Sequence, residues 1–302
     1  MNLRNAVIFT VAFTAGTALA ADGNFDKTYS VSGAPTVSIS TGSGYVHVYP
    51  GSGNQVHIVG HVHSRPGLFG GDADEAVRKI VANPPIVQSG NTITASTPHD
   101  ESDLFRNITI DYDVTTPAET TLKAGSGSGS IEIGGIQTAV TAHTGSGSIH
   151  VDNVGANAQL DTGSGTIRAT NVHGGGMLQT GSGGIELSVS GPGDVRAKTG
   201  SGSIHVDGVN GGVRAETGSG SIEVSGNPTS EWRASSGSGS IQLNPSADAR
   251  FNFEGQTGSG GIRVDRPIVM QGSLNRHHVT GTVNGGGPTV RASTGSGGID
   301  VH

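Results

Sequence analysis

Three histidines lie close together in the segment HIVGHVH near the amino terminus. His61 and His63 are two residues apart, so both would lie on one face of a β-strand that also contains His57. Imidazoles at this spacing, completed by an Asp or Glu from a neighbouring strand, are ligands that suit zinc. The simpler interpretation is three solvent-facing histidines on an outer strand, and we prefer it. The sequence therefore predicts no metal site and no cofactor.

Three arginines form a second group. Arg196, Arg214 and Arg233 occupy one outward position in three successive units of a repeat. Like charges on neighbouring strands cost stability unless something screens them, so such a ladder could hold an anionic glycan or a phosphate-bearing surface. The simpler interpretation is that the arginines are separately solvated and offset by Glu216 and nearby acids. We take these three residues as the candidate ligand surface.

Other chemistries fit the sequence less well. Glycine-rich runs such as Gly145-Ser-Gly147 resemble phosphate loops, but no Gly-Lys-Ser/Thr follows them, and the Asp of calcium-binding β-roll repeats is missing. A polysaccharide-acting enzyme would need carboxylates clustered on one face for acid–base work. The candidate carboxylates are instead scattered, mostly in variable loops: Asp152, Asp161, Asp194 and Asp207. Such an enzyme remains the alternative to a non-enzymatic protein.

The elements that position these residues follow from a repeat. The octapeptide TGSGSIHV occurs at residues 144–151 and again at 199–206. Its isoleucine recurs at steps of 18 to 21 residues and then once at 37, which we interpret as two steps with a degraded copy near Val283 between them. Such a period marks a solenoid. The recurring residues are Ile131, Ile149, Ile167, Ile185, Ile204, Ile222, Ile241, Ile262 and Ile299.

Alternation within each unit predicts which side chains face inward. Apolar residues stand at the isoleucine and two positions later, and another pair stands nine and seven residues earlier, as in Val213 and Ala215 before Ile222. A third apolar residue follows at the fifth position after the isoleucine in several units. The inward parity changes within the Gly-Ser run, which requires a corner, and it turns Thr217 and its equivalents inward. The predicted fold is all-β, a single-stranded parallel β-solenoid (β-helix) with coils of about 18 residues and about three sides.

The amino-terminal part departs from this pattern. Residues 1–20 have the charged, apolar and small-residue regions of a secretory signal peptide, with cleavage expected after Ala20. Residues 21–121 are predicted to form an irregular β cap with a short helical insertion from Asp72 to about Val81, and residues 122–302 the repeats. A separate small β domain is the alternative for the cap.

Composition agrees with a fold that has a thin core and many tight turns. The chain has 52 Gly and no Cys among 302 residues, and aromatic residues make up 4%. Tight turns are therefore expected, and disulfides are excluded. A net charge of -7 argues against a nucleic-acid partner, because phosphate binding needs a concentrated positive field. We expect no transmembrane span after cleavage, and a location in the periplasm, on the outer surface or in the medium.

One family resemblance follows from these motifs. The Ser-Thr-Gly-Ser-Gly segment at residues 40–44, the Pro-containing segment 110–122 and the serial TGSGSI units resemble exported bacterial proteins named putative adhesins. Those proteins contain a domain of unknown function and look related to auto-transporter adhesin head domains. The resemblance covers about residues 30–302 and implies a β-solenoid without defined catalytic residues. Members commonly have Asp or Asn before the isoleucine, where this chain has Ser148, Thr166 and Gly184.

Together these features predict a non-enzymatic, adhesin-like protein of the cell envelope or surface. Its expected partners are a surface glycan or an envelope protein. The chain ends on the recurring strand itself, at Gly298–His302. Because an unpaired strand edge invites further pairing, end-to-end self-association is also expected.

Overall fold

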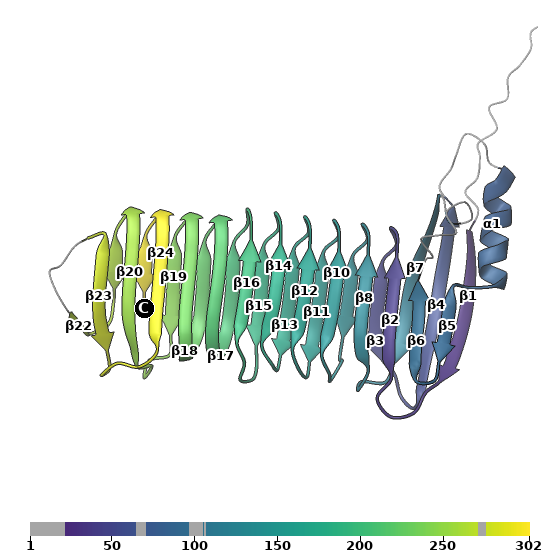
Figure 1. Cartoon of the computed structure of the whole chain (residues 1–302), viewed down its shortest axis with the longest axis horizontal. Helices are drawn as coiled ribbons and strands as arrows, with labels where there is room; N and C mark the ends of the chain where they lie inside the picture. Colours follow the sequence, from purple (N-terminus) through teal and green to yellow (C-terminus); the bar gives the residue numbers. More distant parts are fainter. Residues whose placement is uncertain (1–21, 65–70, 97–104, 106, 271–275) are drawn as a thin grey trace, which may run out of the picture.

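The computed structural model describes residues 22–64, 71–96, 105, 107–270 and 276–302. The expected signal peptide, residues 1–20, lies outside the described residues. The molecule is elongated, with strands stacked side by side along its length and one helix at the amino-terminal end (Figure 1). The expectation of an all-β fold is confirmed, and the arrangement is solenoid-like.

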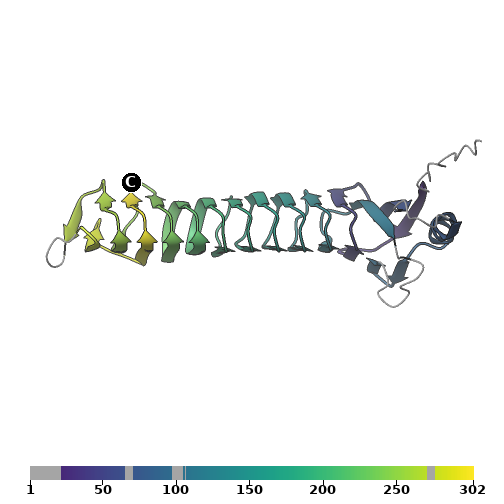
Figure 2. The ribbon, with the colours of Figure 1, turned by 90° about the horizontal axis from the view of Figure 1, so that it is seen from above.

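Two rows of strands form the body and appear as two layers in Figure 2. The first row carries the strands that precede the Gly-Ser runs: β2 (Thr36–Thr41), β8 (Thr121–Ser126), β10 (Val140–Thr144), β12 (Ala158–Thr162), β14 (Gly176–Thr180) and β16 (Val195–Thr199). The second row carries the recurring isoleucines: β3 (Val46–Pro50), β9 (Ile131–Gly134), β11 (Ile149–Val154), β13 (Ile167–Val172), β15 (Ile185–Val189) and β19 (Ile241–Pro245). Two long strands run through both rows: β17 (Ile204–Ser219) and β18 (Ile222–Ser238).

Strands in the middle of each row pair in parallel, in the register that the repeat predicts. Ile149 lies opposite Ile131 on one side and Ile167 on the other. The isoleucines and the residues two positions later are buried in a single core, except for Ile262 and Val264, which are partly buried against it. The third apolar residue of the unit, such as Val154, is also buried, but it lies at the end of a second-row strand. Asn153 precedes it with φ 60°, a left-handed conformation that Asn tolerates. The expected third side is therefore a continuation of the second row.

The sheet is not exclusively parallel, which corrects the expectation from the repeat. Antiparallel pairs form at both ends, where the chain turns back: β1 with β4, β4 with β7, β5 with β6, β20 with β23, and β22 with β23. These strands are β1 (Asp22–Ser30), β4 (Gln55–Ser64), β5 (Ile86–Ser89), β6 (Thr92–Ser96), β7 (Ile108–Thr116), β20 (Phe251–Ser259), β22 (Ile268–Met270) and β23 (His278–Val283).

The helix α1 (Gly71–Ala82) lies where the sequence predicts one and covers the amino-terminal end of the sheet (Figure 1). Its apolar side chains Val77 and Ile80 are buried. The close approach to β1 requires Gly23, because a Cβ there would meet the side chains of Val77 and Val81 at less than 3 Å. Since β2 pairs with β8 and β3 with β9, the cap and the repeats share one continuous sheet.

The carboxyl-terminal units do not stack in sequence order. The last unit, β24 (Thr289–Ser296) and β25 (Ile299–Val301), lies between the unit β18–β19 and the unit β20–β21, where β21 is Ile262–Val264. Ile299 therefore pairs with both Ile241 and Ile262. Val283 is not part of a degraded parallel copy, because its strand β23 runs antiparallel to β20.

This arrangement also corrects the reason given for end-to-end association. The last strand of the chain, β25, is paired on both sides and offers no free edge. Within the described residues, the strands with one partner at this end are β21 and β22. The amino-terminal unit shows the same inward placement, because β2 lies between β6 and β8.

A buried ladder of hydroxyls holds each corner. Thr162 Oγ1 donates a hydrogen bond to the carbonyl of Gly147 in the preceding unit (2.8 Å) and accepts one from the backbone N–H of Gly165 (3.2 Å). The inward direction predicted for these threonines is confirmed. Their equivalents are buried as well: Thr41, Ser126, Thr144, Thr180, Thr199, Thr217, Ser236, Thr257 and Thr294.

Candidate functional site

A groove of about 890 Å³ crosses the edge of the first row over six strands, from β10 to β18. Small residues line it, among them Gly175, Gly193 and Gly212. One end of the groove is lined by uncharged side chains, including Gln159 and Met177. The other end is lined by the three arginines of the candidate ligand surface, Arg196, Arg214 and Arg233.

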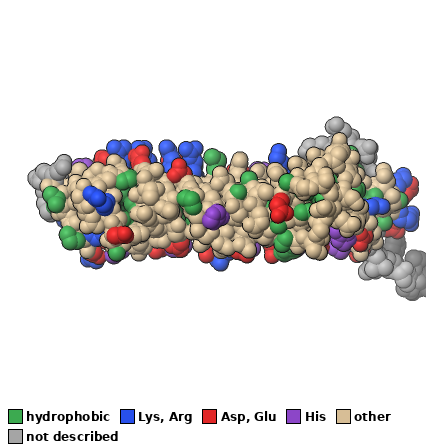
Figure 3. Space-filling model, turned by 90° about the horizontal axis from the view of Figure 1, so that it is seen from below, with side chains coloured by type: hydrophobic (Ala, Val, Ile, Leu, Met, Phe, Trp, Pro, Cys, Tyr) green, Lys and Arg blue, Asp and Glu red, His purple; other side chains and the backbone are tan. Residues whose placement is uncertain are grey.

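The ladder contains a fourth arginine that the sequence did not reveal. Arg196 lies opposite Arg214, Arg214 opposite Arg233, and Arg233 opposite Arg291 on β24. Arg291 was missed because its unit comes last in the chain and inserts one place inward. Figure 3 shows Lys and Arg side chains gathered along one rim of the molecule, toward the end that carries the carboxyl-terminal units.

Carboxylates offset most of the ladder, as the simpler interpretation of the arginines expected. Glu216 lies two residues after Arg214 and pairs with it at 2.6 Å. Among the described residues no ion pair is formed by Arg196, and Lys198 follows it on the same strand. The positive excess therefore lies at β16, in the middle of the molecule. The remaining ion pairs of the ladder are Arg233–Glu231 (3.4 Å), Arg291–Glu231 (3.7 Å) and Arg291–Glu254 (2.8 Å).

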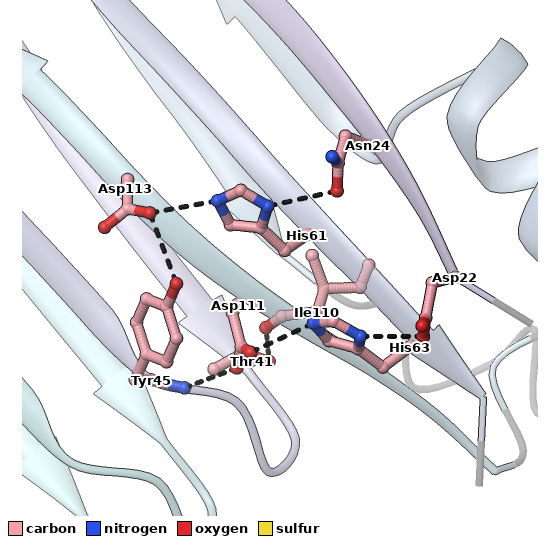
Figure 4. Close-up of polar contacts among 9 residues, drawn as sticks. All are labelled: Asp22, Asn24, Thr41, Tyr45, His61, His63, Ile110, Asp111 and Asp113. Carbon is pink, nitrogen blue, oxygen red and sulfur yellow. Dashed lines mark hydrogen bonds and ion pairs between the residues drawn. The ribbon is translucent and has the colours of Figure 1, made fainter. Parts of the chain in front are cut away.

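The histidines of β4 lie on a second polar face, near the amino-terminal end (Figure 4). His61 contacts Asn24 on β1 (3.0 Å) and Asp113 on β7 (3.1 Å), so the imidazole links two strands on opposite sides of its own. His63 lies in the same way between Asp22 (2.9 Å) and Asp111 (3.4 Å).

His57 completes this row by contacting Asp26 on β1 at 2.7 Å. The shared strand face predicted for His61 and His63 is present, together with the expected carboxylates of neighbouring strands. However, among the described residues no group of three or more His, Cys, Asp or Glu side chains is placed to hold a metal ion. The carboxylates accept hydrogen bonds from the imidazoles instead.

An aromatic strip on β3 and on the residue just before it borders the histidine row. Tyr45, His47 and Tyr49 point outward at alternating positions, and the rings of Tyr45 and His47 stack with centroids 4.2 Å apart. Burial, followed by the charge of Asp113, raises the pKa of Tyr45 to about 12. Burial and a hydrogen bond to Glu132 likewise raise the pKa of Tyr49 to about 12. Both hydroxyls therefore stay protonated at neutral pH, and that of Tyr45 donates to Asp113.

A Ser-x-His-x-Asp arrangement occurs on the second row at Ser203, His205 and Asp207. His205 Nε2 contacts Asp207 (2.5 Å) and Nδ1 contacts Glu223 (3.1 Å). Burial by itself would lower the pKa of His205, but the two carboxylates outweigh it and raise the pKa. A histidine that activates a serine needs one nitrogen directed at the hydroxyl. With both nitrogens on carboxylates, this arrangement does not form a nucleophilic triad.

The part of the chain that the structure describes contains no helix long and apolar enough to cross a membrane.

Comparisons with known proteins place the chain in a family. The family described as Toastrack DUF4097 matches residues 34–302. No curated protein matches the chain.

Several solved structures are similar in part. A putative adhesin from Bacteroides fragilis NCTC 9343 is 12% identical with a TM-score of 0.42, and the alignment covers 93% of this chain and 97% of that one. A putative adhesin from Parabacteroides distasonis ATCC 8503 is 13% identical with a TM-score of 0.34, covering 93% and 97%. A putative cell adhesion protein from Clostridium sporogenes ATCC 15579 is 10% identical with a TM-score of 0.24, covering 92% and 99%. The expected relation to auto-transporter head domains stays a prediction.

Proposed function

We propose that this chain, which belongs to the Toastrack DUF4097 family, is a non-enzymatic, adhesin-like interaction protein of the cell envelope or cell surface. The observation that carries the proposal is the groove over six strands with a ladder of arginines at one end. Export is supported by the signal-peptide pattern of residues 1–20. The long, regular stack of strands would present the groove as a rigid surface.

The ligand of the groove is an anionic glycan. Arg196 supports this choice because it lines the groove and makes no ion pair within the described residues, so its guanidinium is available to a carboxylate or sulfate. Gln159 and Thr141, farther along the groove, offer hydrogen bonds to sugar hydroxyls. Arg214 forms an ion pair with Glu216, so it adds little net positive charge to the groove. Its guanidinium would mainly orient the ligand.

Titration of the purified mature chain with polygalacturonate oligosaccharides tests this function. Binding should weaken with rising salt, because an exposed charge contact is screened. Arg196→Glu should reduce the affinity at least tenfold. The matched control is Arg168→Glu, which reverses an exposed arginine of the second row that pairs with Glu186. Equal affinities of the unchanged chain and the Arg196→Glu variant would remove the groove as the binding site.

A polysaccharide-acting enzyme is the competing function. The arrangement that favours it is the cluster in which Asp207 and Glu223 both contact His205. Incubation with polygalacturonate and with neutral glucans, followed by measurement of new reducing ends, separates the two functions. Reducing ends that appear with the unchanged chain and disappear with Asp207→Asn would favour the enzyme.

End-to-end self-association belongs to the same proposal, moved to the edge that the fold leaves open. Strands β21 and β22 each have one pairing partner in the described structure, and Val269 on β22 is exposed. Sedimentation velocity over a range of concentrations should show a dimer or longer species. Val269→Lys, at an exposed position of β22, should return the chain to a monomer, because a charge on an edge strand opposes pairing. A strict monomer at every concentration would count against this contact.

A further inference from the structure

We propose that the strip Tyr45–His47–Tyr49 is a second binding site, which takes a neutral sugar ring of a glycan. This inference goes beyond the proposed function, because the strip lies on the second row at the amino-terminal end and shares no residue with the arginine groove. Each component of a sugar site is present: an aromatic face to pack against the C–H groups of a ring, and fixed acceptors for its hydroxyls.

Tyr49 supplies the aromatic face. Its ring lies over the backbone of Gly134 on the next strand, where an added Cβ would contact the ring at 3.5 Å. Because Gly134 has no side chain, one face of the ring rests on the sheet, and Tyr49 as a whole residue is 42% exposed. An exposed Tyr of this kind is otherwise uncommon here, because the described residues contain few exposed large apolar side chains.

Hydrogen bonds hold the rings in place before any ligand arrives. The hydroxyl of Tyr45 donates to Asp113 at 3.2 Å, and the carboxylate of Glu132 interacts with Tyr49 closely enough to raise its pKa. His47 lies between the two tyrosines, stacked on Tyr45 and contacting Asp113 at 3.1 Å. Side chains that are already fixed lose little entropy on binding, so a modest contact area can give measurable affinity.

The same carboxylates provide acceptors for sugar hydroxyls. An ionised carboxylate has about four acceptor sites. The nearest Glu132 oxygen lies 4.0 Å from His47 Nε2, and the Glu132 side chain is 45% exposed. It therefore retains acceptor capacity beside the open face of Tyr49. Hydrogen bonds from hydroxyls to charged acceptors are among the stronger ones in water.

The charge of this face selects the class of sugar. Five carboxylates surround the strip and the adjoining histidine row, and the ion pairs they make are all with histidines: Asp22, Asp26, Asp111, Asp113 and Glu132. An anionic sugar would be repelled here, whereas a neutral hexose would not. The two sites would thus hold different parts of a mixed surface polysaccharide.

Titration of the full mature chain with neutral tetrasaccharides of glucose, mannose and N-acetylglucosamine tests the inference. We expect at least one of them to bind at millimolar concentration or below. Tyr49→Ala should reduce that affinity about tenfold, and Tyr49→Phe should reduce it less, because the ring remains. Arg196→Glu should leave it unchanged, so failure at this site and failure at the groove are distinguishable.

Thermal unfolding of each variant shows whether it keeps its fold, and Glu132→Gln provides a second change that removes charge while keeping shape. A loss of affinity in both Tyr49→Ala and Glu132→Gln, with unchanged unfolding temperatures, would support the site. Absence of binding by all three probes, or binding that survives Tyr49→Ala, would overturn it. Preference for an organic cation such as tetramethylammonium over every sugar would also overturn it.

Discussion

Arg233 and Arg291 lie directly opposite each other on paired parallel strands, although the unit β20–β21 and the antiparallel strands β22 and β23 separate them in the sequence. The pairing is possible because the last unit of the chain inserts between β18–β19 and β20–β21. The insertion makes the carboxyl-terminal unit an internal part of the stack. It also makes the outermost unit depend on residues that are synthesised after it.

Deletion of residues 289–302 should therefore disrupt more than the end of the chain. Strand β21 would lose its one described partner, and β20 would keep only β23. We expect fast amide hydrogen exchange throughout β20 and β21 while β10 to β16 stay protected, because local stability follows local pairing. Arg291→Gln is the matched control, since it removes ion pairs but no strand. Protection of β20 and β21 in the deletion variant would contradict the inserted position.

The register of the repeat was predictable from the sequence, and the order of its last units was not. Parity alone identifies Ile149 and Val151 as inward residues, because a one-residue slip would expose both. The units that contain Ile241, Ile262 and Ile299 instead have the same alternation of apolar residues. The local pattern therefore does not decide which of these isoleucines lie opposite each other. The order is set by β23, which pairs antiparallel with β20. Because β23 occupies one side of β20, the last unit pairs with the other side.

For the candidate sites, too, some residues could be predicted from the sequence and others could not. Arg196, Arg214 and Arg233 were found because they repeat within one register, and the alternation of Tyr45, His47 and Tyr49 can be read from the sequence. Their partners cannot. Asp113 and Glu132 reach the aromatic strip only because β3 pairs with both β7 and β9. Both of these strands lie far from β3 in the sequence.

Gly147→Ala should destabilise the stack strongly. A Cβ at Gly147 would overlap the carbonyl oxygen of Gly129 in the preceding unit, which is backbone and cannot move aside. We expect a loss of about 1–3 kcal/mol or more in the free energy of unfolding, measured by urea denaturation. Gly42→Ala is the control, because nothing lies within 4 Å of the added atom. Similar losses in the two variants would show that packing at the corner is not the cause.

Thr162→Val should reveal the contribution of the buried hydroxyl ladder. The change keeps the shape of the side chain but leaves the carbonyl of Gly147 and the N–H of Gly165 without the bonds that Thr162 makes. An unsatisfied buried polar group costs about 1–3 kcal/mol, so the urea midpoint should fall. Thr162→Ser, which keeps the hydroxyl, should lose less. A smaller loss in the valine variant would argue that burial of the methyl group matters more than the hydrogen bonds.

His205→Gln should change how stability depends on pH. Burial alone would lower the pKa of His205, but Asp207 and Glu223 outweigh it, so the folded chain holds the proton more tightly than the unfolded chain does. The stabilisation is complete below the unfolded pKa of about 6.5 and is lost as pH rises through the raised folded value. The difference in urea midpoint between the unchanged chain and the variant should therefore be largest near pH 6 and small at pH 9.

The control for this pH dependence is His150→Gln. His150 has the same outward position as His205, and it forms no ion pair among the described residues. Its variant should therefore follow the unchanged chain at every pH. The side chains around His205 are 39–46% exposed, so the expected effect is small, and salt should reduce it further. A difference that grows toward alkaline pH would reverse the sign of the coupling and exclude the two carboxylates as its cause.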